Sequence, residues 1–196
     1  MRPIRLEDIK DPTAYGRVRS EIRRRVIELR NLRRVQVGER ISVVFENRET
    51  TLYQIQEMLR TERVTDETAI LREIEMHNEM LPSPRSLAGT LFVELDEPGK
   101  IREHLEEFVG LDRGDHLWFE LGEAGRVQAR FTEGQGEEGR IASVHYVRFP
   151  FSEEAASAFR DLTHPVTLVM DHPSYQAKAV VEGATRRALA EDMQDE

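Results

Sequence analysis

The stretch ISVVFENR, residues 41–48, contains the change of period that decides the fold. Ile41, Val43 and Phe45 occupy every second position, which is the period of a strand with one buried face. Asn47 can accept a hydrogen bond from the first turn of a helix, which we expect over residues 49–61. The chain therefore passes directly from a strand into a helix, and both element types must share one fold.

Helical periodicity extends to both sides of this stretch. Apolar residues recur every three or four positions in the first part of the chain and predict a long amphipathic helix within residues 1–36. After the strand, a second amphipathic pattern with an acidic first turn predicts a helical hairpin, so residues 37–84 are interpreted as a strand plus that hairpin. A proline-rich loop at 81–84 ends the region.

Residues 85–182 carry the pattern of an antiparallel sheet, with short alternating runs separated by turns. Short helices are expected at 98–109 and 152–162, and a glutamate- and glycine-rich loop at 133–140. The tail, 183–196, is expected to start as a helix and fray. The expected strands are Thr90–Leu95, His116–Leu121, Arg126–Thr132, Ile141–Phe149 and Val166–Met170.

This order predicts a single α+β domain over residues 1–196, with an N-terminal helical region followed by a mainly antiparallel β-sheet with packed helices. The elements do not form a βαβ series. No glycine-rich phosphate loop follows a strand, which argues against a doubly wound nucleotide-binding fold.

Composition excludes several functional classes. The chain has no cysteine, so it cannot form disulfides or cysteine-ligated metal centres, and any metal cofactor would need His and carboxylate ligands. The net charge of −9 opposes binding to nucleic acid and to anionic membrane surfaces. The sequence shows neither a secretory signal nor a membrane-spanning run, so we expect a cytoplasmic protein.

The charge is unevenly distributed. Arginines concentrate on the expected N-terminal helix, whereas residues 191–196 are mostly acidic. These two poles can pair with each other or with partners. The arginine-rich face has two interpretations: a solvated helix surface with intrahelical glutamate partners, or a docking face for an acidic partner. A homodimer through the long helix is a further expectation.

The first candidate site surrounds the strand-to-helix junction and comprises Glu46, Arg48, Gln54 and Glu57. In one interpretation these residues are structural, with Glu57 paired to Arg60 on the same helix face. In the other, Glu46 and Glu57 act as acid and base or as metal ligands, and Arg48 binds an anionic substrate.

Histidines supply the other candidates. Glu73 and His77 are four residues apart on an expected helix and can share one metal ion. In the segment 143–149, alternation places His145 near an apolar surface and puts Tyr146 and Arg148 together on the other face, where they could bind an anion. His145 is interpreted either as a hydrogen-bonded core residue or as a metal ligand or general base. His172 would join a multi-histidine site if the strand order brought it near His77 or His145.

The segments 45–48, 54–58, 78–82 and 145–149 resemble those of a bacterial family catalogued as domain of unknown function 3501, and the resemblance spans nearly the whole chain. It implies a gene neighbourhood that contains a rubrerythrin-like protein and an iron–sulfur oxidoreductase. This neighbourhood in turn implies a role in peroxide handling or redox metabolism. The resemblance assigns no role to any residue.

Two functional hypotheses follow. The first is an accessory or interaction protein of such a redox system, which docks through the arginine-rich helix onto a rubrerythrin-like or iron–sulfur protein. The second is a metal- or small-molecule-binding protein or enzyme that uses the Glu, Gln, Arg and His side chains above. Convergence of these side chains in one concave pocket would favour the second hypothesis.

Overall fold

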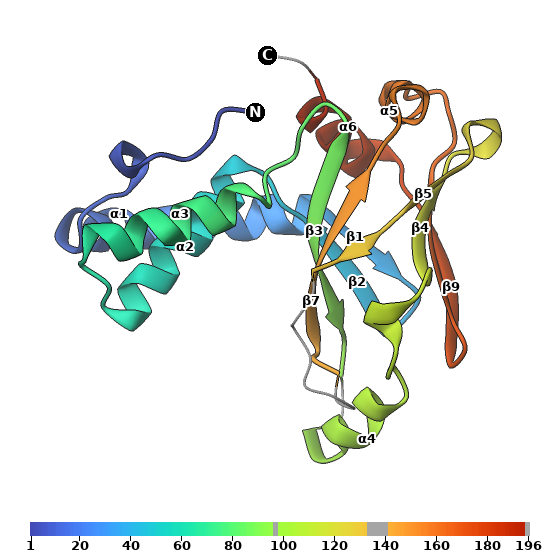
Figure 1. Cartoon of the computed structure of the whole chain (residues 1–196), viewed down its shortest axis with the longest axis horizontal. Coiled ribbons are helices and arrows are strands. Elements are labelled where there is room, and N and C mark those ends of the chain that lie inside the picture. The colour runs from blue at the N-terminus through green and yellow to red at the C-terminus, as the bar shows by residue number, and fades with distance from the viewer. Residues whose placement is uncertain (96–97, 133–140, 195–196) are drawn as a thin grey trace.

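A computed structural model describes residues 1–95, 98–132 and 141–194. The expected α+β class is confirmed, since helices accompany two antiparallel sheets. Figure 1 shows a helical arm that extends to one side of a two-sheet body. The loop expected at 133–140 lies outside the described residues.

The arm has a small hydrophobic core of its own, built from Ile4, Ile55, Leu59, Ile74 and Leu81. Aspartate or asparagine side chains cap the start of each of its three α-helices by accepting amide hydrogen bonds. Its elements are the 3₁₀ turn η1 (Leu6–Asp8) and the helices α1 (Pro12–Leu32), α2 (Arg48–Glu62) and α3 (Glu67–Asn78).

The body consists of a five-stranded sheet, ordered β1-β2-β3-β7-β6, and a four-stranded sheet, ordered β5-β4-β8-β9. All neighbouring strands are antiparallel. The first sheet contains β1 (Arg34–Val37), β2 (Ile41–Phe45), β3 (Ser86–Val93), β6 (Arg130–Phe131) and β7 (Val144–Pro150). The second contains β4 (Leu117–Glu120), β5 (Arg126–Gln128), β8 (Thr167–His172) and β9 (Tyr175–Val180).

The main core lies between the two sheets and is dominated by aromatic rings. Phe45 and Phe149 of the first sheet contact Phe119 of the second, with ring centroids 5.6 and 4.6 Å away. All three side chains are fully buried. Such contacts contribute packing energy beyond simple area burial and hold the two sheets face to face.

Helices close the ends of the body. The short helix α4 (Ile101–Glu106) lies at one end, and α5 (Glu153–Arg160) and α6 (Gly183–Asp192) lie at the opposite end (Figure 1). Short 3₁₀ turns occur at Pro98–Lys100, Leu111–Arg113 and Gly122–Ala124.

Several element boundaries differ from those expected from the sequence. The first helix ends at Leu32, and the chain continues almost at once as strand β1, whose Val35 and Val37 face the core. The segment expected as one strand at 126–132 bends at Ala129 and contributes β5 and β6 to different sheets. The strand β9 was not expected, because its apolar positions are small alanines that give a weak hydrophobic pattern.

Candidate functional site

The outer face of the five-stranded sheet carries polar side chains toward the helical arm. In β7, Tyr146 and Arg148 alternate with the buried residues His145 and Val147. The register pairs Tyr146 with Thr90 and Arg148 with Ala88 of β3, so these residues share the outer face. The inner residues belong to the body interior.

A cavity of about 390 Å³ lies where the C-terminal end of α3 meets this outer face. We call it the junction pocket. Its walls combine methionine, alanine, valine and threonine side chains with a histidine, a tyrosine, an arginine and the acidic residue Glu79. Met76, His77, Met80, Ala88, Tyr146 and Arg148 are among its lining residues.

Arg148 is the main charged group of the junction pocket. Its side chain is half-buried, and Nη1 donates a hydrogen bond of 2.8 Å to the hydroxyl of Ser86. None of the carboxylates in the described part of the chain forms an ion pair with it, although Glu79 lies near enough to affect it. Burial lowers the pKa of Arg148, and the charge of Glu79 opposes this effect. The pocket therefore contains a partly desolvated cation that forms no ion pair with a carboxylate of the described residues, although the charge of Glu79, which also lines the pocket, acts on it.

Tyr146 and His77 supply further polar groups. Gln54 of α2 donates a hydrogen bond of 3.0 Å to the Tyr146 hydroxyl, which ties the arm to the sheet. His77 Nδ1 lies 2.9 Å from the carbonyl oxygen of Glu73 and 3.8 Å from its carboxylate. Since a carbonyl can only accept, Nδ1 carries the proton and Nε2 is left as an acceptor in the neutral ring.

Glu46 lies on the same outer face but does not line the pocket. It is only 2% exposed, and Oε1 accepts a hydrogen bond of 3.0 Å from the Thr90 hydroxyl. Its other oxygen, Oε2, is buried without a hydrogen-bond partner among the described residues. Burying a polar atom without a hydrogen-bond partner costs free energy, so Glu46 does not serve packing alone.

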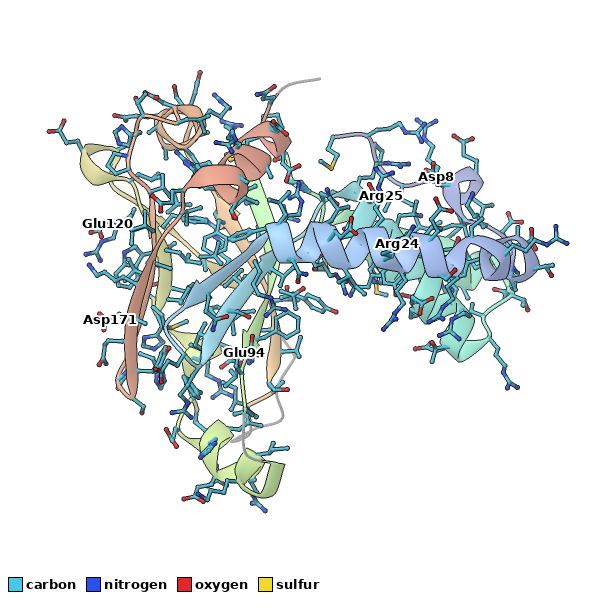
Figure 2. The ribbon with its side chains drawn as sticks, turned by 180° about the vertical axis from the view of Figure 1, so that it is seen from behind. Asp8, Arg24, Arg25, Glu94, Glu120 and Asp171 are labelled. Atoms are coloured by element: carbon cyan, nitrogen blue, oxygen red, sulfur yellow. The ribbon has the colours of Figure 1, made fainter. Side chains whose placement is uncertain are left out.

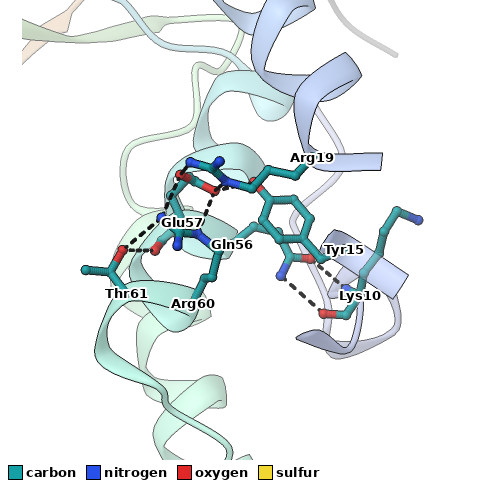
Figure 3. Close-up of polar contacts among 7 residues, drawn as sticks. All are labelled: Lys10, Tyr15, Arg19, Gln56, Glu57, Arg60 and Thr61. Atoms are coloured by element: carbon teal, nitrogen blue, oxygen red, sulfur yellow. Dashed lines mark hydrogen bonds and ion pairs between the residues drawn. The ribbon is translucent and has the colours of Figure 1, made fainter. Parts of the chain in front are cut away.

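Glu57 and Arg48, in contrast, are engaged within the arm. Figure 3 shows Glu57 accepting hydrogen bonds from the Tyr15 hydroxyl at 2.8 Å and from two nitrogens of Arg19 at 2.7 Å each. The Arg19 hydrogen bonds are the largest cause of a Glu57 pKa of about 2, and burial is the largest cause of a raised pKa for Tyr15. Arg48 donates to the carboxylate of Asp8 at 2.5 Å. Glu57 thus joins α2 to α1, and Arg48 joins α2 to η1, so both side chains stabilise the arm.

A second cavity, of about 300 Å³, lies between the N-terminal segment and the arm helices, beside this cluster. Tyr15, Gln56 and Arg60 line it, and Gln56 is held by the backbone of Lys10 through both ends of its amide (Figure 3). Because Tyr15 and Arg60 already donate hydrogen bonds to Glu57 and Gln56 is bonded to the Lys10 backbone, these groups offer little to a ligand.

The remaining histidines are separated from the junction pocket. His145 is 1% exposed on the inner side of the sheet, its Nε2 lies 2.8 Å from the Ala142 carbonyl oxygen, and burial lowers its pKa. His172 packs edge-on against His116, with ring centroids 4.9 Å apart. Within the ranges that the structure describes, no three His, Asp or Glu side chains gather to hold a metal ion.

Of the sequence-based candidates, the structure thus brings together Gln54, Tyr146, Arg148 and His77, and it separates Arg48, Glu57 and His145 from them. Glu73 contacts His77 but does not line the pocket. The lining residues Met76 and Met80 were missed, because methionines near a helix end carry no recognisable motif. Helical spacing could not have indicated both, because Met76 lies in α3 and Met80 lies two residues beyond its end at Asn78.

Fold and pocket together define a two-sheet α+β protein with a helical arm and a polar cavity at their junction. The chain belongs to the family described as Protein of unknown function (DUF3501), which it matches over residues 3–193. It is also similar to a crystal structure of a "novel protein of unknown function" from Burkholderia pseudomallei K96243, with a TM-score of 0.89 and 26% sequence identity. That similarity covers 98% of this chain and 100% of the other.

A search of curated proteins finds no match to this chain. None of the helices in the described ranges is both long enough and apolar enough to cross a lipid bilayer.

Proposed function

We propose that the protein binds a small organic carboxylate in the junction pocket. The observation that carries the proposal is Arg148, a half-buried guanidinium that lines a cavity and has no carboxylate partner among the described residues. A desolvated charge without a counter-ion is unfavourable in the free protein, and a ligand carboxylate would relieve this cost. Arginine matches carboxylate geometry because its planar fork can donate two parallel hydrogen bonds.

The other lining residues define the rest of the ligand. Tyr146 and His77 are polar lining residues, whereas Met76, Met80 and Ala88 are apolar ones. Methionine side chains adapt to ligands of different shape. A carboxylate that bears a short apolar group fits this combination better than a fully polar anion does.

The proposal is tested by calorimetric titration of the protein with acetate, butyrate and hexanoate at constant ionic strength. Affinity should rise along the series, because each added methylene that enters the pocket contributes about 0.8 kcal/mol. Arg148→Gln should weaken binding of hexanoate by about 10- to 100-fold, since a charge-assisted hydrogen bond contributes about 1.5–3 kcal/mol. Arg72→Gln is the matched control, because Arg72 is exposed on α3 and does not line the pocket.

Equal binding of all three acids, or equal loss in Arg148→Gln and Arg72→Gln, would contradict the proposal. A second variant, Met80→Ala, separates the two parts of the pocket. It should reduce the dependence on chain length while leaving acetate binding unchanged.

A second candidate function is docking onto an acidic protein through α1. Arg17, Arg23 and Arg24 are exposed on this helix, and none forms an ion pair within the described part of the chain. The exposed side chain of Ile27 lies beside Arg23 and Arg24 in a shallow groove. In Figure 2, α1 crosses the near side of the arm, with Arg24 labelled on it. An apolar side chain among unpaired cations suits a mixed, partly electrostatic interface.

The partner class for this second function comes from the family resemblance, namely a rubrerythrin-like or iron–sulfur protein. Biolayer interferometry with such a purified protein tests it. The double variant Arg23→Glu/Arg24→Glu should abolish binding, and Arg72→Glu, elsewhere on the arm, should not. Binding that is insensitive both to the double variant and to added salt would reject docking through α1.

A further inference from the structure

A cleft of about 260 Å³ lies where α6 begins, opposite the segment that joins α5 to β8. We call it the α6 cleft. It is separate in sequence from the junction pocket and shares no lining residue with it. Its polar and charged lining includes Thr163, His164, Glu182, Arg186 and Arg187, and Gly183 lies beside them.

The start of α6 differs from that of the other long helices. In α1, α2, α3 and α5 the residue before the helix accepts a hydrogen bond from the first turn through its side chain. In α6 the corresponding residue, Glu182, makes no such bond. Gly183 opens the helix with a φ of +61°, and a Cβ placed there would meet no atom within 4 Å. The space beside Gly183, at the positive end of the helix dipole, is therefore open.

An independent feature of the same cleft is a buried cation with an unused donor. Arg186 is only 3% exposed, and its guanidinium lies 4.0 Å from the centroid of the Phe159 ring. Nη2 donates to the carbonyl oxygens of Ala158 and Asp161, each at 3.3 Å, whereas Nη1 is buried without a hydrogen-bond partner among the described residues. An unpaired donor on a buried charge is costly in the free protein.

Two cations that could attract an anion, Arg186 and Arg187, line the cleft. Arg187 is exposed at its edge and forms no ion pair in the described ranges, and His164 lies 2.7 Å from the Leu121 carbonyl oxygen through Nε2. Two carboxylates oppose this. Asp161 Oδ1 accepts hydrogen bonds from the Thr163 amide and hydroxyl, and the charge of Asp161 also acts on Arg186. Glu182 is exposed and can point into solvent.

We propose that the α6 cleft binds a tetrahedral oxyanion of the phosphate class, held by the first-turn amides of α6, by Nη1 of Arg186 and by Arg187. Backbone amides at a helix start combined with an arginine fork are the groups that recognise phosphate in proteins. The cleft is larger than a phosphate ion, so it also accommodates a phosphomonoester of a small alcohol. Inorganic phosphate and a phosphomonoester share the recognised chemistry.

The experiment is a titration of ¹⁵N-labelled full-length protein with inorganic phosphate and, separately, with glycerol 3-phosphate, both at constant ionic strength and with sodium chloride as reference. Saturable shifts of the Gly183, Ala184 and Thr185 amide resonances with either phosphate are expected, and they are absent with chloride. Tighter binding of glycerol 3-phosphate would identify a phosphomonoester site, and tighter binding of phosphate would identify a site for the free ion. Shifts that match those in chloride would overturn the proposal.

Glu182→Asp is the sharpest variant. It keeps the charge of the cleft but shortens the side chain, so that its carboxylate can cap the first turn and occupy the amides itself. The dissociation constant for phosphate should rise at least about tenfold while the melting temperature is maintained or raised. Arg187→Gln should weaken binding less, and Arg72→Gln should leave it unchanged. Wild-type affinity in both Glu182→Asp and Arg187→Gln would refute the site even if variants of Arg186 fail to fold.

Discussion

At the scale of single residues, the same chemical type serves two purposes in this protein. Arg19 is neutralised by a bidentate carboxylate, whereas Arg148 has only a hydroxyl partner among the described residues. Paired charges of the first kind stabilise the fold. Charges left without a partner in a cavity are available for ligands and contribute little to stability.

Glu57→Gln should lower the free energy of unfolding at pH 7 by about 2 kcal/mol, because charge-assisted hydrogen bonds to Arg19 are lost. The folded-state pKa of about 2 lies below the usual glutamate value of 4.5, so this stabilisation is complete above about pH 4.5 and is lost as the pH falls toward 2. Urea unfolding of wild type and variant across this range measures it. The difference between the two proteins should shrink steadily with acid.

Glu75→Gln serves as control for this experiment, because Glu75 is exposed on α3 without an ion pair in the described ranges. A pH-independent difference between Glu57→Gln and wild type would show that the lost stability is not electrostatic.

Arg148→Met is expected to fold with unchanged or slightly greater stability, in contrast to variants of the Glu57 cluster. The substitution removes a partly desolvated charge and retains apolar volume against Met76 and Met80. Thermal unfolding of wild type and variant in ligand-free buffer provides the measurement. A loss above about 2 kcal/mol would indicate a structural role like that of Arg19.

Local sequence patterns predicted which face a side chain occupies, but not its distant partners. Alternation along 143–149 was enough to place Tyr146 and Arg148 on one face and His145 on the other. The partners of Glu57 could not be derived, since Arg19 and Tyr15 lie 38 and 42 residues away in the chain. Local spacing suggested Arg60, which does bind Glu57, but at longer distances of 3.3 Å.

At the scale of elements, glycines in a helix and in a strand should respond in opposite ways to the same change. Gly16 is exposed in α1, and a Cβ there would meet no atom within 4 Å, so Gly16→Ala should stabilise the protein by about 0.5–1 kcal/mol. In β3, a Cβ on Gly89 would lie 2.9 Å from the Val44 carbonyl oxygen and 3.1 Å from Val43 Cγ1. Gly89→Ala should therefore destabilise by about 1–3 kcal/mol.

Chemical denaturation of the two alanine variants beside wild type tests both expectations with one chemical change. A stabilised Gly89→Ala would mean that β2 and β3 can separate slightly without cost, which the close packing of the sheet argues against.

Element boundaries were less predictable from sequence than element types. The strand β1 has only four residues and follows α1 directly, so its alternation was absorbed into the helical pattern. The C-terminal tail was expected to start as a helix and fray, and the structure extends that helix, α6, to Asp192. In the fold its Leu189 and the following Met193 are fully buried. Tertiary burial, which local patterns do not reveal, fixes both elements.

At the scale of the whole molecule, two charge poles meet across the chain. Arg33, at the end of α1, forms a buried ion pair with Asp192 of α6, with nitrogen–oxygen distances of 2.5 and 2.9 Å. The arginine-rich and acidic ends of the sequence therefore do pair with each other at this point. The pair joins the base of the arm to the helix that closes one end of the body.

This connection predicts that arm and body unfold together. Trp118, the only tryptophan, lies in β4 and reports on the body. Circular dichroism at 222 nm is dominated by the helices, and most of the α-helical residues belong to the arm helices α1, α2 and α3. In denaturant unfolding of the wild-type protein, tryptophan fluorescence and circular dichroism should give the same transition midpoint. Asp192→Asn should lower both midpoints together, because it leaves the charge of Arg33 buried and unpaired. The loss in free energy of unfolding should be about 3 kcal/mol.

The exposed residue Asp171 supplies the control variant Asp171→Asn, which should leave both midpoints unchanged. Replacing both partners, as in Arg33→Met/Asp192→Leu, should recover most of the stability, since no unpaired charge then remains in the interior. If the helical signal in Asp192→Asn is lost before the Trp118 signal changes, the arm is an independent folding unit. The junction pocket would then open and close with the arm, and carboxylate binding should raise the arm's midpoint toward that of the body.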